Sequence, residues 1–114
     1  MAIIKGDNHL RSVSGISRQE ESNIIIYLQG AISIQTKKSG AEWFGLRDLM
    51  GGANFDWNNT PLYPLYLKHL TLKKNNPVKS AGKDCGWLLK KAIILDKRNF
   101  ETKQFLFNRQ YKLI

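Results

Sequence analysis

Four lysines in the second half of the chain are spaced so that a single helix would carry them on one face. At about 100° per residue they fall within roughly 40° of one another, opposite an apolar stripe. They are Lys79, Lys83, Lys90 and Lys97. Gly82 and Gly86 flank this line and leave little side-chain bulk between the lysines. Because lysines that neutralise phosphates release condensed counterions, such a face favours binding of a phosphate backbone.

The net charge of the chain lies in the same half. Residues 1–60 carry six Lys or Arg and six Asp or Glu, whereas residues 61–114 carry twelve against three, a balance of +9. A one-sided basic surface is typical of proteins that bind polyanions. The alternative is an ordinary solvated helix face, but no acidic residue interrupts the lysine line, which favours binding. We therefore expect a nucleic-acid partner.

Composition narrows the remaining function classes. The 114 residues suit one domain, and 42% apolar with 24% charged residues is ordinary for a packed globular protein. Cys85 cannot form an internal disulfide, and with His9 and His69 it makes no metal-ligand spacing, so we expect neither a metal nor a cofactor. We see no signal peptide and no apolar run that could span a bilayer. We expect a cytoplasmic protein with no membrane partner.

The first two thirds of the chain predict helices and one brief strand. Ser17 followed by Glu20 is a capping-box signature that starts a helix, which should end before Gly40. A short strand is expected at 42–44, then a helical turn at 45–50 and a loop at 51–59. Thr60-Pro61 predicts the start of a second helix, because threonine can cap and proline suits the first helical position.

The last third contains the clearest periodicity. Apolar residues recur at steps of three and four after Pro77, which predicts a helix at 78–95. After Asp96 the apolar period becomes two, which is typical of strands. We therefore expect a β-hairpin at 98–114.

Helix, short strand, helix, basic helix and C-terminal hairpin is the order of elements in a winged helix, a variant of the helix-turn-helix. The chain resembles this fold class by element order alone, over residues 17–114, and resembles no specific family within it. The resemblance implies an α+β domain with about three helices. Residues 1–16 have no sustained apolar period, so we expect them to be an N-terminal arm. It also implies that the helix before the hairpin enters the major groove while the wing contacts the DNA backbone or minor groove.

We expect the interface to combine the basic helix with the wing. The candidate DNA-binding residues are Lys79, Lys83, Trp87, Lys90, Lys91, Lys97, Arg98, Lys103, Asn108 and Arg109. Specific base contacts usually come from Arg, Asn or Gln, whereas this helix offers mainly Lys, which favours contacts with phosphate. Asn108, Arg109 and Gln110 are the better candidates for contacts with bases, although they could equally be the polar side of an exposed strand.

Aromatic residues around Gly51-Gly52 admit two interpretations. Trp43, Phe55 and Trp57 could stack on bases, but a domain this small needs large core anchors, so we expect core packing. Trp87 falls beside the lysine line and is the aromatic candidate for the interface.

Catalysis is not expected. Glu101-Thr102-Lys103 with Asp84 or Asp96 has residue types that could bind a divalent metal for phosphodiester cleavage, but such a nuclease normally needs a larger sheet. Cys85 and His69 could be a nucleophile and its base, yet Cys85 lies on the apolar face of its helix, where thiols are buried and inert.

The sequence thus predicts a non-enzymatic DNA-binding protein, a transcription regulator or accessory factor, that places helix 78–95 and hairpin 98–114 on duplex DNA. One alternative is a protein-interaction module or inhibitor whose basic face meets an acidic protein, with Trp57 and Trp87 as anchors. A second alternative is RNA binding. A homodimer would suit paired half-sites, although the sequence marks no clear dimer helix.

Overall fold

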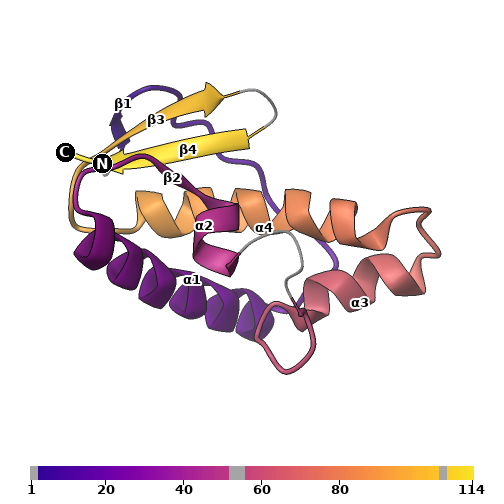
Figure 1. Ribbon diagram of the computed structural model, residues 1–114. Helices are drawn as coiled ribbons and strands as arrows, with labels where there is room; N and C mark the ends of the chain where they lie inside the picture. The colour runs from indigo at the N-terminus through magenta and orange to yellow at the C-terminus, as the bar shows by residue number, and fades with distance from the viewer. Residues whose placement is uncertain (1–2, 52–55, 106–107) are drawn as a thin grey trace.

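The computed structural model describes residues 3–51, 56–105 and 108–114, and Figure 1 shows their arrangement. Helix α4 runs through the middle of the molecule, with the sheet on one side and α1 and α3 on the other (Figure 1). The elements are β1 (Ile3–Lys5), α1 (Arg18–Ser39), β2 (Phe44–Gly45), α2 (Leu46–Met50), α3 (Tyr63–Thr71), α4 (Pro77–Ile94), β3 (Phe100–Phe105) and β4 (Asn108–Leu113).

The α+β class and the C-terminal hairpin are confirmed. Four strands form one mixed sheet in the order β1-β3-β4-β2, in which β3 and β4 are the predicted antiparallel hairpin. Strand β2 pairs antiparallel with β4, with Phe44 opposite Tyr111. The described residues contain four helices rather than about three, because the expected helical turn at 45–50 forms the short helix α2.

Helix α1 begins where its capping box predicts. The Ser17 hydroxyl accepts a hydrogen bond from the Glu20 amide at 3.0 Å, and the Ser17 amide donates to the Glu20 carboxylate at 2.8 Å. The β-prone stretch that follows is nevertheless helical, because tertiary burial of one face outweighs intrinsic propensity. That buried face consists of Ile24, Ile25, Leu28, Ile32 and Thr36.

Helix α4 spans Pro77–Ile94, so it begins and ends one residue earlier than the predicted 78–95. The Asn76 side chain caps it by accepting a hydrogen bond from the Lys79 amide at 3.1 Å. The predicted apolar stripe is buried from its second residue onward, whereas Val78 at its start is exposed. The buried apolar residues of α4 are Ala81, Cys85, Leu88, Leu89, Ala92 and Ile93.

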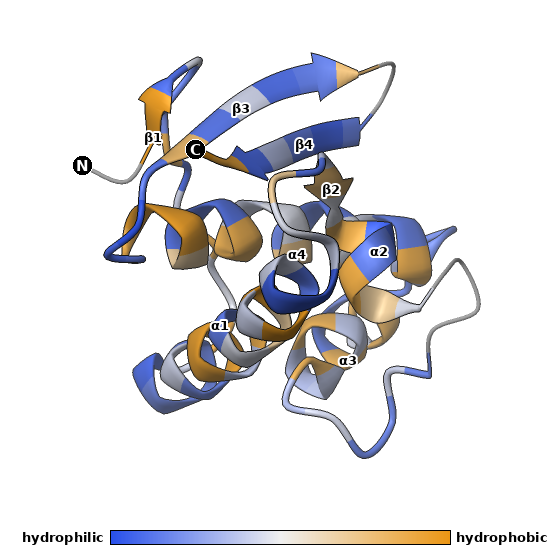
Figure 2. Ribbon diagram, turned by 60° about the vertical axis from the view of Figure 1, so that its left-hand side comes forward, coloured by the Kyte–Doolittle hydropathy of each residue, from blue (hydrophilic) through white to orange (hydrophobic). Residues whose placement is uncertain are grey.

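Three aromatic rings from the sheet complete the core. Phe44 of β2 contacts Phe100 of β3 edge to face, with ring centroids 6.5 Å apart, and Tyr111 of β4 at 6.1 Å. All three side chains are almost wholly buried. Elsewhere β3 and β4 are hydrophilic along most of their length (Figure 2). The hairpin therefore buries one part of one face and leaves the rest in solvent.

The N-terminal residues differ from the expected free arm. Strand β1 pairs in parallel with β3, and Ile3 is buried in the core. At Gly6 the backbone φ is +102°, and a side chain there would collide with the carbonyl oxygen of Thr102. Residues 7–16 then cross the molecule without helix or strand. Part of the predicted arm is thus a strand of the sheet. The isolated apolar residues of this segment have no period that would have predicted it.

The packing of α3 on α4 makes a stability prediction. Leu65 of α3 is fully buried, whereas Leu67 on the same helix is 43% exposed. Leu65→Ala should lower the free energy of unfolding by about 2–5 kcal/mol through lost burial and a cavity. Leu67→Ala, the matched control, should change it by less than about 0.5 kcal/mol. Chemical denaturation followed by circular dichroism measures both, and equal losses would contradict this packing.

Candidate nucleic-acid interface

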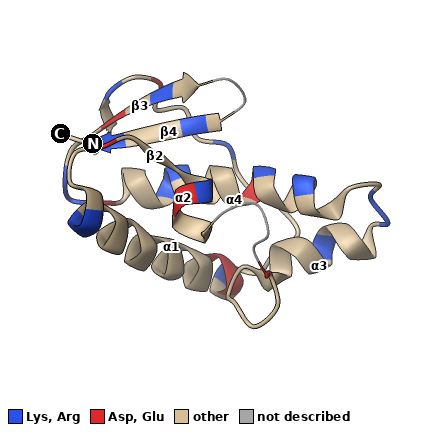
Figure 3. Cartoon of the chain, viewed as in Figure 1, with Lys and Arg blue, Asp and Glu red and all other residues tan. Residues whose placement is uncertain are grey.

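A groove of about 1110 Å³ lies between α4, α2 and the β3–β4 hairpin. Five cationic side chains line it, against two carboxylates, and Figure 3 shows Lys and Arg on each of these elements. The cationic residues are Arg47, Lys79, Lys83, Lys90 and Arg109, and the acidic ones are Asp7 and Asp48. The structure therefore brings the predicted helix and wing together around one basic groove.

The floor of the groove is open along α4. A Cβ atom added at Gly82 or Gly86 would meet nothing within 4 Å, and both glycines line the groove together with exposed Lys79 and Lys83 and with Trp87. Glycine disfavours a helix by about 1 kcal/mol relative to alanine, so two of them in α4 carry a cost. The absence of side chains at these two positions allows a ligand to come close to the helix backbone.

Lys90 is the main correction to the predicted lysine line. Its side chain is only 4% exposed, and its ammonium lies 3.7 Å from the Asp7 carboxylate and 5.6 Å from the Trp87 ring centroid. Burial lowers the pKa of Lys90, while Asp7 acts in the opposite direction. Helical phase placed Lys90 correctly on the groove side of α4. It could not show that residues 7–9 would lie over it.

Asp7 bridges the two basic elements of the groove. Its carboxylate lies 3.7 Å from Lys90 and 3.8 Å from the Arg109 guanidinium. A hydrogen bond from the His9 amide, with smaller contributions from Lys90 and Arg109, lowers the pKa of Asp7, so the carboxylate is charged at neutral pH. The His9 ring then meets Trp87 edge to face at 6.1 Å. This segment thus places an anion where two cations converge.

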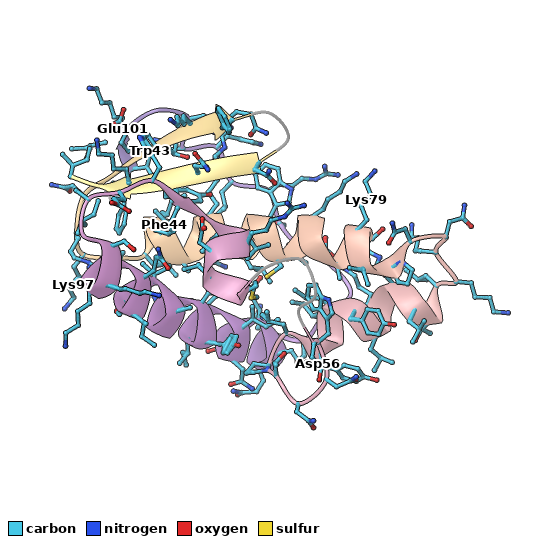
Figure 4. All side chains as sticks on the ribbon, viewed as in Figure 1. Trp43, Phe44, Asp56, Lys79, Lys97 and Glu101 are labelled. Carbon is cyan, nitrogen blue, oxygen red and sulfur yellow. The ribbon has the colours of Figure 1, made fainter. Side chains whose placement is uncertain are left out.

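Three predicted contact residues lie outside the groove, since Lys91 and Arg98 are engaged elsewhere and Lys97 lies beyond the end of α4. Lys91 forms an ion pair with Glu21 of α1 at 2.9 Å. Lys97 follows the end of α4, and Figure 4 shows it at the opposite end of that helix from Lys79. Arg98 pairs with Asp96 at 3.0 Å and donates to the hydroxyl of Thr36. None of the three lines the groove.

Lys103 lies on another part of the hairpin. Its ammonium is 4.1 Å from the ring centroid of Trp43, which Lys112 also approaches at 5.7 Å. Trp43 is therefore half-buried beneath two lysines rather than packed in the core as expected. The neighbouring Gln104 lines the groove, whereas Lys103 contacts Trp43 instead.

Six of the predicted interface residues do line the groove: Lys79, Lys83, Trp87, Lys90, Asn108 and Arg109. Gln110, which was a candidate for contacts with bases, also lines the groove. Arg47 of α2 was missed. The sequence does predict a helical turn at 45–50, but only the pairing of β2 with β4 brings that turn to the hairpin.

Trp57 lines the groove while packing against the core, with its ring stacked on Tyr66 at 6.4 Å. This agrees with the expectation of core packing for that tryptophan. Phe55 lies outside the described residues.

Three of the residues considered for catalysis, Asp84, His69 and Asp96, are engaged in ion pairs. The Asp84 carboxylate lies 2.6 Å from both the Lys68 ammonium and the His69 ring, and Asp96 is paired with Arg98. Within the described ranges, no three His, Cys, Asp or Glu side chains are arranged to hold a metal ion. In the same part of the chain, no helix has the length and apolarity needed to cross a membrane.

Cys85 provides a chemical test of the core beneath the groove. The thiol is fully buried, and burial raises its pKa to about 12. At about pH 8, roughly one such thiol in ten thousand is ionised, so alkylation should be negligible in the native protein and complete in denaturant. Mass spectrometry after iodoacetamide treatment measures the difference. Rapid native labelling would contradict the buried position of Cys85.

No family model, curated protein or solved structure matches this chain. The function has to be argued from the groove, from its charges, its open glycines and the elements that form it.

Proposed function

We propose that the chain binds duplex DNA, with α4 in the major groove and the β3–β4 hairpin bracing it as a wing. The observation that carries this proposal is the convergence of Lys79 and Lys83 of α4 with Arg109 of β4 around the open helix surface at Gly82 and Gly86. A major groove about 12 Å wide admits an α-helix. Cations on both elements would then meet the phosphates that border it.

The element order supports a winged-helix arrangement. Helix α1, strand β2, a helical pair, the basic helix and the hairpin follow in that order, and β2 joins the sheet of the hairpin. Two features depart from the expected element order. The sheet also contains β1, and α3 follows α2 and precedes α4 along the chain. The resemblance to a winged helix is therefore limited to α4 and the hairpin, which are the parts that would dock on DNA.

The residue types favour binding to the phosphate backbone over sequence reading. The groove side of α4 offers Lys79 and Lys83, which act as point charges rather than as bidentate donors. Asn108, Arg109 and Gln110 on β4 are the side chains suited to base edges. Affinity should therefore depend strongly on salt, with modest sequence preference from the hairpin.

Salt dependence tests the assigned surface. Replacing Lys79, Lys83 and Arg109 together by Ala should reduce the slope of log K against log salt by about three, because each neutralised phosphate contributes about 0.9. The matched control replaces Lys91, Lys97 and Lys103 by Ala, which removes the same charge from outside the groove. The control should leave the slope near its original value in fluorescence-anisotropy titrations. Equal slopes for the two triple variants would show that the groove is not the DNA-binding surface.

The position of Asp7 makes a second prediction. Asp7→Asn removes an anion that competes with phosphate for Lys90 and Arg109, so DNA affinity at low salt should rise about threefold to tenfold and the slope should steepen by about one. Asp56→Asn is the matched control, because Asp56 is exposed and does not line the groove (Figure 4). Equal affinities for the two variants would show that Asp7 does not compete with the ligand.

Competition among nucleic acids separates the alternatives. Duplex DNA should displace a labelled DNA duplex better than duplex RNA or single strands do, because α4 needs an accessible major groove and A-form RNA has a deep, narrow one. A preference for RNA would replace this proposal with RNA binding. Absence of binding to all three at low salt would favour an acidic protein partner instead.

A further inference from the structure

The outer face of α1 carries apolar side chains that no described part of the chain covers. Ile26 is 64% exposed and Ile34 is 69% exposed. Gly30 lies midway between them, and a Cβ atom added there would meet nothing within 4 Å. Two exposed isoleucines around a glycine give this face an apolar centre that another helix could approach closely.

The residues of this face are arranged symmetrically about Gly30. Ile26 and Ile34 are each four residues away from it, and Asn23 and Lys37 are each seven residues away. On a helix of about 100° per residue, all four project within roughly 40° of the Gly30 direction. All five residues are exposed.

We infer that this face of α1 docks on the same face of a second copy of the chain, antiparallel, with the two-fold axis at Gly30. Ile26 of one copy then packs on Ile34 of the partner subunit, and Asn23 lies beside Lys37 of the partner subunit. The two glycines meet at the axis, where the absence of side chains allows close approach. This interface is independent of DNA binding.

A second copy fits this face better than an unrelated partner does, because an isologous contact requires each residue to meet its own symmetry mate. The apolar positions pair with apolar ones in this register, and the polar pair offers an amide to an ammonium. Charge is complementary as well. The first turn of α1 contains Glu20, the last turn contains Lys37 and Lys38, and the antiparallel arrangement brings these turns together, whereas Glu21 projects to the opposite side of α1 and pairs with Lys91.

The surroundings of this face leave room for the contact. A hollow of about 460 Å³ between α1 and α2 is lined by Tyr27, Ala31 and Leu49 beside Ile34, where the Ile26 side chain of the partner subunit would fit. No α1 residue lines the basic groove. The residues that form the dimer contact are therefore separate from those that line the groove.

Sedimentation of the full chain over a range of roughly 10–500 µM tests for the dimer, since a contact through a single helix belongs to the small and weak class of interfaces. Ile26→Glu and Ile34→Glu should each raise the dissociation constant of the dimer by more than about tenfold. Leu70→Glu, at a position 46% exposed on α3, is the matched control and should leave it unchanged. Circular dichroism verifies that each variant is folded.

Cysteine cross-linking tests the register. Gly30→Cys should form a disulfide-linked dimer under mild oxidation, because the two thiols lie at the axis. Ile26→Cys alone should not, since its two thiols are separated by eight residues of rise, about 12 Å, beyond the roughly 7 Å Cα separation that a disulfide allows. Mixing Ile26→Cys with Ile34→Cys should restore the cross-link. Buried Cys85 does not interfere.

A chain that stays monomeric over the whole range overturns the inference. So does a dimer that both glutamate variants leave intact, or one that cross-links equally at every position. These measurements contain no DNA, so their failure and a failure of DNA binding are observed separately.

Discussion

Helix α4 packs in the core along one side and lines an open groove along the other, and the rest of the structure depends on that division. Ala81, Cys85 and Leu88 are buried against α1, α3 and the sheet. On the opposite side, Gly82 and Gly86 give up helix stability of about 1 kcal/mol each relative to alanine. Burial of the apolar side is what keeps the helix intact despite this cost. The positions of Lys79, Lys83 and Lys90 in the groove follow from the burial of the opposite side of α4.

Of the two carboxylates in the groove, one comes from the N-terminal segment and none comes from α4. Strand β1 anchors this segment to β3, the turn at Gly6 redirects it, and Asp7 then lies between Lys90 and Arg109. A lysine as buried as Lys90 needs such a partner, because desolvation of an unpaired charge is costly. The same contact that stabilises Lys90 in the free protein occupies two cations that a phosphate could use. Stability of the free protein and ligand affinity are therefore opposed at this point.

Local signals in the sequence were sufficient to predict most helices and strands. They were insufficient to predict how these elements pack against one another. The Ser17–Glu20 cap and Pro77 fixed the helix starts, and the change of period after Asp96 located the hairpin. The lysine line failed at Lys97, because α4 ends at Ile94, and at Lys90, because a segment about eighty residues earlier covers it. Arg47 was missed since it reaches the groove only through pairing of β2 with β4. Contacts between distant segments carry no periodicity that a single sequence reveals.

The central claim is that the glycine-lined face of α4 is where nucleic acid lies. Amide spectra in a ¹⁵N-labelled NMR titration with a short DNA duplex at low salt test it most directly. The account predicts that the amides of Gly82 and Gly86 shift together with that of Gly45 at the groove wall, while those of Gly30 and Gly40 on the far side of α1 stay in place. Shifts confined to Gly30 and Gly40, or no shifts at all, would contradict it.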